Sequence, residues 1–250
     1  MADGRQELGA RADGVRWVLA HDAEQVLALV AGEHQPAGQG GEHLAGRAAG
    51  RLRADGADAR FVQLDVTSPA SITRAVSGLD SLDVLINNAG IALGEWVASE
   101  STVDSMRRVF ETNVFGVVAL TNALLPVLRR SPAGRIVNVS SEVGSMTTQL
   151  RRDGPLWKMT GLAYPSSKAA LNMVTALYAK ELWDTPIKVN AANPGYCATD
   201  LNGRRGVRSP TQGAEVCVHL ATLPDDGPTG VLWGDRTFSH GESTDGLLPW

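Results

Sequence analysis

Tyr164-Pro-Ser-Ser-Lys168, together with the preceding segment Arg135-Ile-Val-Asn-Val-Ser-Ser-Glu-Val-Gly144, decides how this chain is interpreted. Tyr164 and Lys168 are four residues apart, so a helix would place both side chains on one face, one turn apart. An ammonium beside a phenol favours the phenolate and lowers the phenol's pKa from about 10. Such a phenol exchanges a proton with a carbonyl or alcohol oxygen near neutral pH. An isolated pair of this kind is more often part of an ordinary amphipathic helix, so the surrounding sequence must decide.

The composition is that of an ordinary globular protein. The 250 residues are 43% hydrophobic and 20% charged, which suits one large domain with a sizeable core. A net charge of −4 gives no reason to expect nucleic acid or an anionic membrane as a partner. No apolar run approaches the roughly 20 residues of a spanning helix, and the polar N-terminus is unlike a signal peptide. Cys197 and Cys217 show no metal or redox spacing and are interpreted as buried thiols. We expect a cytoplasmic protein.

Apolar segments without polar alternation are separated by helical segments along most of the chain. This order predicts an α/β fold with a doubly wound parallel sheet covered on both faces, in a single domain spanning 1–250. The predicted strands are 15–20, 61–66, 82–87, 135–140, 186–191 and a last one within 231–250. The predicted helices are 22–30, 47–55, 71–78, 103–110 continuing through 113–128, and 164–182.

Four predicted strands end in small or polar residues. Ligands of such sheets bind beyond the carboxyl ends of the strands, and small residues there let the backbone approach a flat ligand closely. The endings therefore predict a cofactor cleft: Asp65-Val66, Asn87-Asn88-Ala89-Gly90, Ser140-Ser141 and Asn193-Pro194-Gly195.

These endings, with Asn113 and the Tyr164-x-x-x-Lys168 pair, occur in one particular order. In that order the chain resembles the short-chain dehydrogenase/reductase superfamily over roughly residues 47–230, and within it the carbonyl-reductase branch. The resemblance implies a Rossmann-like fold. It also implies reduction of a ketone or aldehyde to an alcohol, or the reverse, by hydride transfer from NADP(H), with NAD(H) left open. The implied partner is a small carbonyl or alcohol substrate.

The resemblance also implies a role for each matching residue. Tyr164 would be the general acid or base, and Lys168 would lower its pKa and hold the nicotinamide ribose. Ser141 would polarise the substrate carbonyl, because the family's serine lies three residues before a glycine, here Gly144; Ser140 is then a strand-end cap. Asn113 would hold a water for proton relay. The remaining implied cofactor contacts are Asp65 and Val66 at the adenine, Asn88, Ala89 and Gly90 at the adenosine ribose, and Pro194, Gly195 and Thr199 at the nicotinamide.

Three further segments extend this interpretation. The 23-residue step from Ser141 to Tyr164 is longer than is usual in the superfamily. Its apolar side chains could cover the helix face that other members use for dimerisation, so we expect a monomer; a mobile substrate lid is the alternative. The loop 196–208 would close over an apolar substrate, with its arginines Arg204, Arg205 and Arg208 read as a solvated face. Residues 231–250 would end near the substrate mouth.

The first 46 residues depart from the family pattern. The best match to the family's Thr-Gly-x-x-x-Gly-x-Gly loop has Ala31 for Thr and Pro36 for the middle glycine, and it adds Glu33. Proline removes an N–H that would bind phosphate. The span from Gly38 to Phe61 is also too short for a second strand with its helices, so we expect an incomplete first βαβ unit, arising from a frame change or a misassigned start. The alternative function is therefore a catalytically silent relative with impaired cofactor binding.

Overall fold

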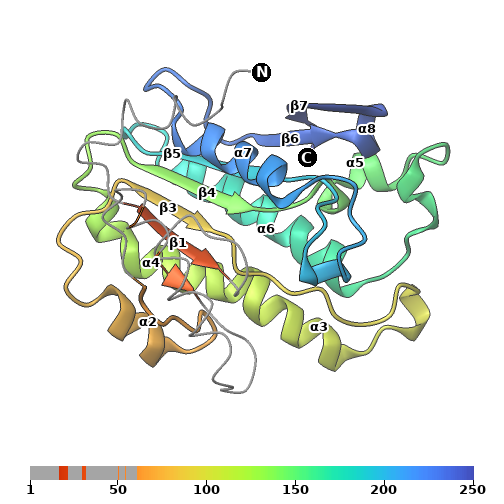
Figure 1. Cartoon of the computed structure of the whole chain (residues 1–250), viewed down its shortest axis with the longest axis horizontal. Helices are drawn as coiled ribbons and strands as arrows, with labels where there is room; N and C mark the ends of the chain where they lie inside the picture. Colours follow the sequence, from red (N-terminus) through yellow and green to blue (C-terminus); the bar gives the residue numbers. More distant parts are fainter. Residues whose placement is uncertain (1–16, 22–29, 32–49, 51–53, 55–60) are drawn as a thin grey trace.

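One sheet organises the molecule. The computed structural model describes residues 17–21, 30–31, 50, 54 and 61–250, and Figure 1 shows the sheet running through the middle of them. Strands β1 to β6 pair in parallel, in the spatial order β2-β1-β3-β4-β5-β6, and β7 pairs antiparallel with β6. The strands are β1 (Trp17–His21), β2 (Val30–Ala31), β3 (Val84–Asn87), β4 (Arg135–Val139), β5 (Lys188–Asn193), β6 (Leu232–Arg236) and β7 (Glu242–Leu248).

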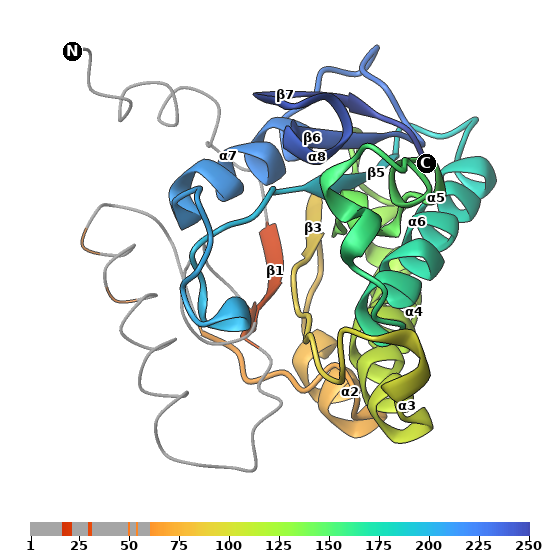
Figure 2. The ribbon, with the colours of Figure 1, turned by 90° about the vertical axis from the view of Figure 1, so that its right-hand side faces the viewer.

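Helices cover both faces of this sheet, which confirms the predicted Rossmann-like α/β class. Figure 2 shows α7 on one side of the strands and α4 and α6 on the other. The longer helices are α2 (Pro69–Val76), α3 (Val103–Phe110), α4 (Val117–Leu128), α6 (Ala163–Glu181) and α7 (Pro210–Ala221). The short ones are α5 (Met146–Gln149), α8 (Thr237–His240) and the turns η1 (Ala98–Glu100), η2 (Glu111–Gly116), η3 (Glu142–Gly144), η4 (Pro155–Lys158) and η5 (Asp200–Asn202).

The core has two layers, because successive side chains of a strand point to opposite faces of a sheet. Leu85, Ile136 and Val189 face α4 and α6, where they pack with Leu120 and Leu124 of α4. Their neighbours along the strands face the other way, toward α7, and this second layer consists of Val84, Ile86, Val137 and Ala192 with Val216 and Leu220. The apolar strands of the sequence are therefore buried on both faces.

A chain of buried polar side chains ties four elements together behind the carboxyl edge. The Asn87 side-chain amide donates to Thr121 at 3.1 Å and to Asn138 at 2.8 Å. Asn138 in turn donates to the Thr175 hydroxyl at 2.9 Å. These residues belong to β3, α4, β4 and α6 in that order. Because buried polar groups are costly unless they are paired, this network fixes the lateral positions of the elements that carry the site.

The predicted helix over 103–128 is interrupted. Residues Glu111–Gly116 form a turn of π-helix between α3 and α4. Such bulges often lie at functional sites, and this one contains Asn113. The helical run Val103–Leu128 is also long and apolar enough to cross a membrane, contrary to the expectation that no segment would be, but most of it is buried inside the molecule. It therefore serves as a core helix of this fold.

Two expectations at the β2 edge are wrong. A strand does stand in the second-strand position, but it is Val30–Ala31, paired in parallel with β1, where the end of a helix was predicted. The predicted strand 61–66 is reduced to a single bridge at Gln63. A two-residue β2 offers little backbone for a further strand to pair with. The predicted helices 22–30 and 47–55 and the glycine-rich segment after Ala31 lie mainly outside the described residues.

Candidate active site

The segment after β4 is pressed against the backbone of helix α6. Ser140 and Ser141 follow the strand, and η3 leads to Gly144. A Cβ added to Gly144 would lie 2.5 Å from the carbonyl carbon of Lys168 and 2.7 Å from the amide nitrogen of Ala169. Only glycine allows this approach. The requirement explains why the serine lies three residues before a glycine, and it places residues 141–144, the catalytic turn, beside the first turns of α6.

The two candidate catalytic hydroxyls meet at this contact. Tyr164 lies in the first turn of α6, and a hydrogen bond joins its hydroxyl to that of Ser141. Burial raises the pKa of Tyr164 to about 12, and the Ser141 hydrogen bond acts in the opposite direction. A pKa in this range keeps the Tyr164 phenol in its protonated form at neutral pH.

Lys168 lies next to Tyr164, as the four-residue spacing predicts, with its ammonium over the phenol ring. The Lys168 ammonium is 5.5 Å from the centroid of the Tyr164 ring and donates to the backbone carbonyl of Val139 at 2.8 Å. Burial lowers the pKa of Lys168 to about 8. The shift of the Tyr164 pKa has burial and Ser141 as its causes, so the lowering of this pKa by Lys168 stays a prediction.

Asn113 anchors the loop that follows β3. Its Oδ1 accepts the N–H of Ile91 at 2.9 Å, and its Nδ2 donates to the carbonyl of Ile91 at 2.9 Å and to Ser167 at 3.0 Å. A Cβ at Gly90 would lie 3.5 Å from Asn113 Oδ1 and 3.7 Å from Lys168 Nζ. Gly90, Asn113 and Lys168 thus meet at one point, and the π-helical turn brings Asn113 there.

Ser140 has a structural place, as predicted. Its side chain is buried and its hydroxyl donates to Asn172 Oδ1 on α6 at 2.5 Å. It points into the helix while Ser141 points to Tyr164, as expected for adjacent residues of an extended chain.

The residues predicted to contact the adenine and its ribose have mainly structural contacts. Asp65 Oδ1 accepts the backbone N–H of Thr67 at 2.9 Å and the Thr67 hydroxyl at 2.7 Å, which caps the start of the following turn. Val66 is buried against Gly116, where a Cβ would lie 2.9 Å from Val66 Cγ2. Its side chain is therefore a packing group. Ala89 is buried in the same core and Asn88 is half-buried at the edge.

The predicted nicotinamide end is shaped by Gly195. Its φ is +77°, and a Cβ there would lie 2.7 Å from Asp235 Oδ2, so this turn requires glycine. The Cys197 thiol donates a hydrogen bond to the carbonyl oxygen of Pro194 at 3.3 Å. Thr199 is the residue before η5, and its side chain does not cap that turn. Pro194, Gly195 and Thr199 follow the carboxyl end of β5, and Gly90 follows the carboxyl end of β3, beside Lys168.

Comparison with known proteins decides the family. A family model described as short chain dehydrogenase matches residues 37–208. The chain belongs to the short-chain dehydrogenase family. It is therefore an oxidoreductase, and the sequence resemblance is confirmed over a range that begins ten residues earlier than expected and ends sooner.

Named relatives agree with the carbonyl-reductase branch of this family. The chain is 39% identical over 171 residues to short-chain dehydrogenase anuI of Penicillium roqueforti, covering 64% of this chain and 67% of that one. It is 31% identical over 228 residues to carbonyl reductase [NADPH] 1 of Rattus norvegicus, covering 74% and 81%. A solved NADPH-bound carbonyl reductase from chicken fatty liver matches with a TM-score of 0.69 at 28% identity, covering 89% and 88%. The expectation of NADP(H) agrees with these two carbonyl reductases.

The structure of this dehydrogenase adds charged residues that the sequence did not single out. Arg208, read as part of a solvated face, is buried and pairs with Asp235 at 2.8 Å and Asp245 at 2.9 Å. Arg204 is exposed, with its guanidinium 3.0 Å from Asp200. Glu142, immediately after Ser141, is also buried. The sequence signal for Glu142 was its position directly after Ser141. The burial of Arg208 had no local signal, because its two partners lie 27 and 37 residues away in the sequence.

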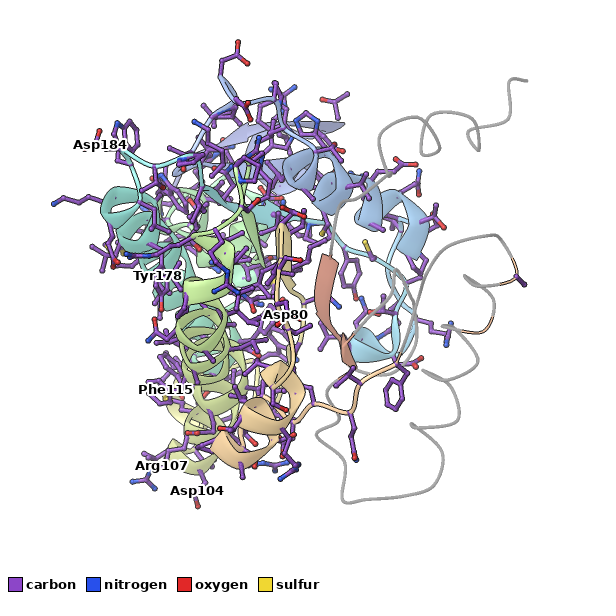
Figure 3. The ribbon with its side chains drawn as sticks, turned by 90° about the vertical axis from the view of Figure 1, so that its left-hand side faces the viewer. Asp80, Asp104, Arg107, Phe115, Tyr178 and Asp184 are labelled. Atoms are coloured by element: carbon purple, nitrogen blue, oxygen red, sulfur yellow. The ribbon has the colours of Figure 1, made fainter. Side chains whose placement is uncertain are left out.

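The long segment between Ser141 and Tyr164 does not cover the outer helix face as expected. Leu156 is buried, while Leu150, Trp157 and Leu162 are exposed. The segment packs instead on the loop after β3, where the Thr160 hydroxyl donates to the Trp96 carbonyl at 3.3 Å. The outer apolar side chains of η2 and α6 remain exposed: Phe115, Met173 and Leu177. Figure 3 shows Phe115 pointing outward.

The close approach of the catalytic turn to α6 predicts a specific stability effect. Gly144→Ala should lower the free energy of unfolding by about 3 kcal/mol, because backbone atoms of α6 must move to admit the methyl group. Urea unfolding measures the change. Gly78→Ala is the control: its φ is +84° but nothing lies within 4 Å of the new Cβ, so dihedral strain alone should cost about 1 kcal/mol. Equal losses in the two variants would contradict the steric account.

Proposed function

We propose that this dehydrogenase reduces a ketone or aldehyde to an alcohol with NADP(H), or catalyses the reverse reaction, with Tyr164 as general acid or base. The observation that carries the proposal is the hydrogen bond between Ser141 and Tyr164, beside Lys168 at the carboxyl edge of the sheet. Because the Ser141 and Tyr164 hydroxyls are adjacent, both could form a hydrogen bond to the same substrate oxygen.

The protein's part in reduction follows from these groups. Ser141 donates a hydrogen bond to the substrate oxygen, which polarises the carbonyl and stabilises the negative charge that develops there. Tyr164 then transfers its proton to the same oxygen. With a pKa of about 12 the phenol is protonated at neutral pH, so it is ready to act as the acid. NADPH, when bound, supplies the hydride to the carbonyl carbon.

Lys168 and Asn113 prepare the cofactor side of the site. Lys168 is buried with a pKa near 8, so it keeps its proton over most of the neutral range. Its ammonium would hold the ribose hydroxyls next to the nicotinamide, and Asn113 keeps the neighbouring loop fixed through Ile91. Gly90, Gly195 and Thr199 would line the same edge. The choice of NADP(H) over NAD(H) is supported by the two NADPH-linked carbonyl reductases.

The substrate that fits best is a mainly apolar ketone. Exposed aromatic and aliphatic side chains occur on the loops around the carboxyl edge, among them Trp96, Tyr196, Leu201 and Trp250. Relatives include a protein named (+)-neomenthol dehydrogenase from Capsicum annuum, 28% identical over 244 residues. Neomenthol, an apolar cyclic alcohol, is therefore a suitable first probe with NADP⁺, together with its ketone and NADPH.

A catalytically silent relative is the second candidate. Its support is the reduced first unit: β2 has two residues, and Asp65 Oδ1 is occupied by Thr67. In that case the catalytic residues would persist without cofactor binding.

Substitution of the phenol separates the two candidates. Tyr164→Phe should lower kcat/KM for the ketone about a thousandfold, because the proton donor is lost, and Ser141→Ala about a hundredfold. NADPH oxidation followed at 340 nm measures both. Tyr178→Phe is the matched control: that hydroxyl donates to Asn122 on the outer helix face, so activity should stay within twofold. Wild-type-like rates in Tyr164→Phe would refute the assignment.

The assembly and location remain predictions. A monomer is the expected state from the sequence, and the exposed side chains of Phe115, Met173 and Leu177 leave the helix face open to a second copy. Light scattering should give the chain mass of 26.4 kDa. A mass two or four times larger would refute the monomer. A cytoplasmic location is expected for a reductase of this kind.

A further inference from the structure

The C-terminal residues are attached to the segment that carries the catalytic serine. Glu142 Oε1 accepts the backbone N–H of Phe238 at 3.1 Å. Arg151 donates to the carbonyl of Ser239, and the Ser145 hydroxyl donates to the carbonyl of Trp250 at 3.1 Å. Figure 1 shows α8 and the C-terminus beside α5, beyond the end of β4. All three anchoring side chains lie between residues 142 and 151, next to Ser141.

Glu142 differs from the other two anchors because its backbone N–H is bonded to a residue of the sheet rather than to a neighbour in its own segment. Its backbone N–H donates to Asn193 Oδ1 at 3.2 Å, and Asn193 Nδ2 donates to the carbonyl of Asp235 at 2.6 Å. The main chain of Glu142 is therefore tied to the ends of β5 and β6, while its carboxyl group reaches α8. Any shift of this residue moves Ser141, its neighbour in the chain.

The charges around Glu142 leave its carboxyl group without a cation. It is 1% exposed, and its Oε2 has no hydrogen-bond partner of good geometry among the described residues. The charged group that acts on it is Asp235 of β6, whose carboxylate shares the Arg208 guanidinium with Asp245, and Arg151 donates to the carbonyl of the neighbouring Ser239. Burial, with a smaller effect of the Asp235 carboxylate, raises the pKa of Glu142; Phe238 and Ser239 act in the opposite direction. Buried acids whose pKa is shifted in this way occur preferentially at functional sites.

We propose that Glu142 is a positioning residue for the carbonyl-reducing reaction: by joining the catalytic turn to α8, it holds the Ser141 hydroxyl at Tyr164. The inference rests on the proposed function. Since Glu142 acts through Ser141, its removal should weaken stabilisation of the transition state more than binding of the substrate.

Kinetics of four variants test this role with neomenthol's ketone and NADPH. Glu142→Ala should lower kcat about tenfold and leave KM within twofold, while Glu142→Gln, which keeps an acceptor for the Phe238 N–H, should restore kcat to within twofold to threefold. In a Ser141→Ala background, Glu142→Ala should cost less than a further twofold, because residues that act through one another are not additive. Glu215→Ala, at an exposed position on α7, is the control and should leave kcat unchanged.

The pH dependence of stability gives a second readout. A carboxyl whose pKa is raised by folding stabilises the fold in its protonated form; that contribution is complete below the ordinary value of 4.5 and is lost as the pH rises through the folded pKa. Glutamine cannot ionise. The melting temperature of Glu142→Gln relative to the wild type should therefore rise between pH 5 and pH 8, and a constant difference would contradict an ionising buried Glu142.

The outcomes separate this inference from the proposed function. A loss in Glu142→Ala that persists undiminished in the Ser141→Ala background, or unchanged kcat in Glu142→Ala, overturns the positioning role while Tyr164→Phe still tests the function. If the wild type reduces no ketone, the function fails, and hydrogen exchange then tests the contact itself. Amides of residues 141–144 and 237–240 should exchange faster in Glu142→Ala than in Glu142→Gln. Equal exchange would overturn the inference.

Discussion

The site depends on the contact between a four-residue turn and the backbone of one helix. Gly144 lies so close to Lys168 and Ala169 that a single methyl group would not fit. That contact places Ser141, at the start of the turn, against Tyr164, in the first turn of the helix. Without it, β4 and α6 would still share one hydrophobic cluster through Ile136 and Ala179, but the Ser141 and Tyr164 hydroxyls would not be held together.

Buried polar groups supply the precision around that contact. The hydrogen bonds from Asn87 through Asn138 to Thr175 fix the lateral positions of β3, β4 and α6. Asn193 links the catalytic turn to β6. Such groups are expensive to desolvate and tolerate few alternative arrangements. They thus favour one geometry at the carboxyl edge, where Arg208 also joins the loop 196–208 to β6 and β7 through Asp235 and Asp245.

The features that could be predicted from sequence are those set by local pattern. The apolar strands and the helix with Tyr164 and Lys168 follow from periodicity and from residue types within a few positions. Features set by distant contacts were missed. The π turn at Asn113 depends on Ile91, the burial of Arg208 depends on two later strands, and the raised pKa of Tyr164 follows from burial that no spacing shows. The spacing of Tyr164 and Lys168 gives a shared face, but not which atom the ammonium approaches.

Cofactor binding tests the central claim most directly, because every catalytic role assigned here requires a nicotinamide beside Lys168 and Tyr164. The chain has six tryptophans whose emission can report binding, and NADPH fluorescence offers an independent signal. The account predicts saturable binding in the micromolar range for the wild type, weakened at least about tenfold in Lys168→Met. No binding of NADPH at millimolar concentration would contradict it and would identify the chain as a silent member of its family.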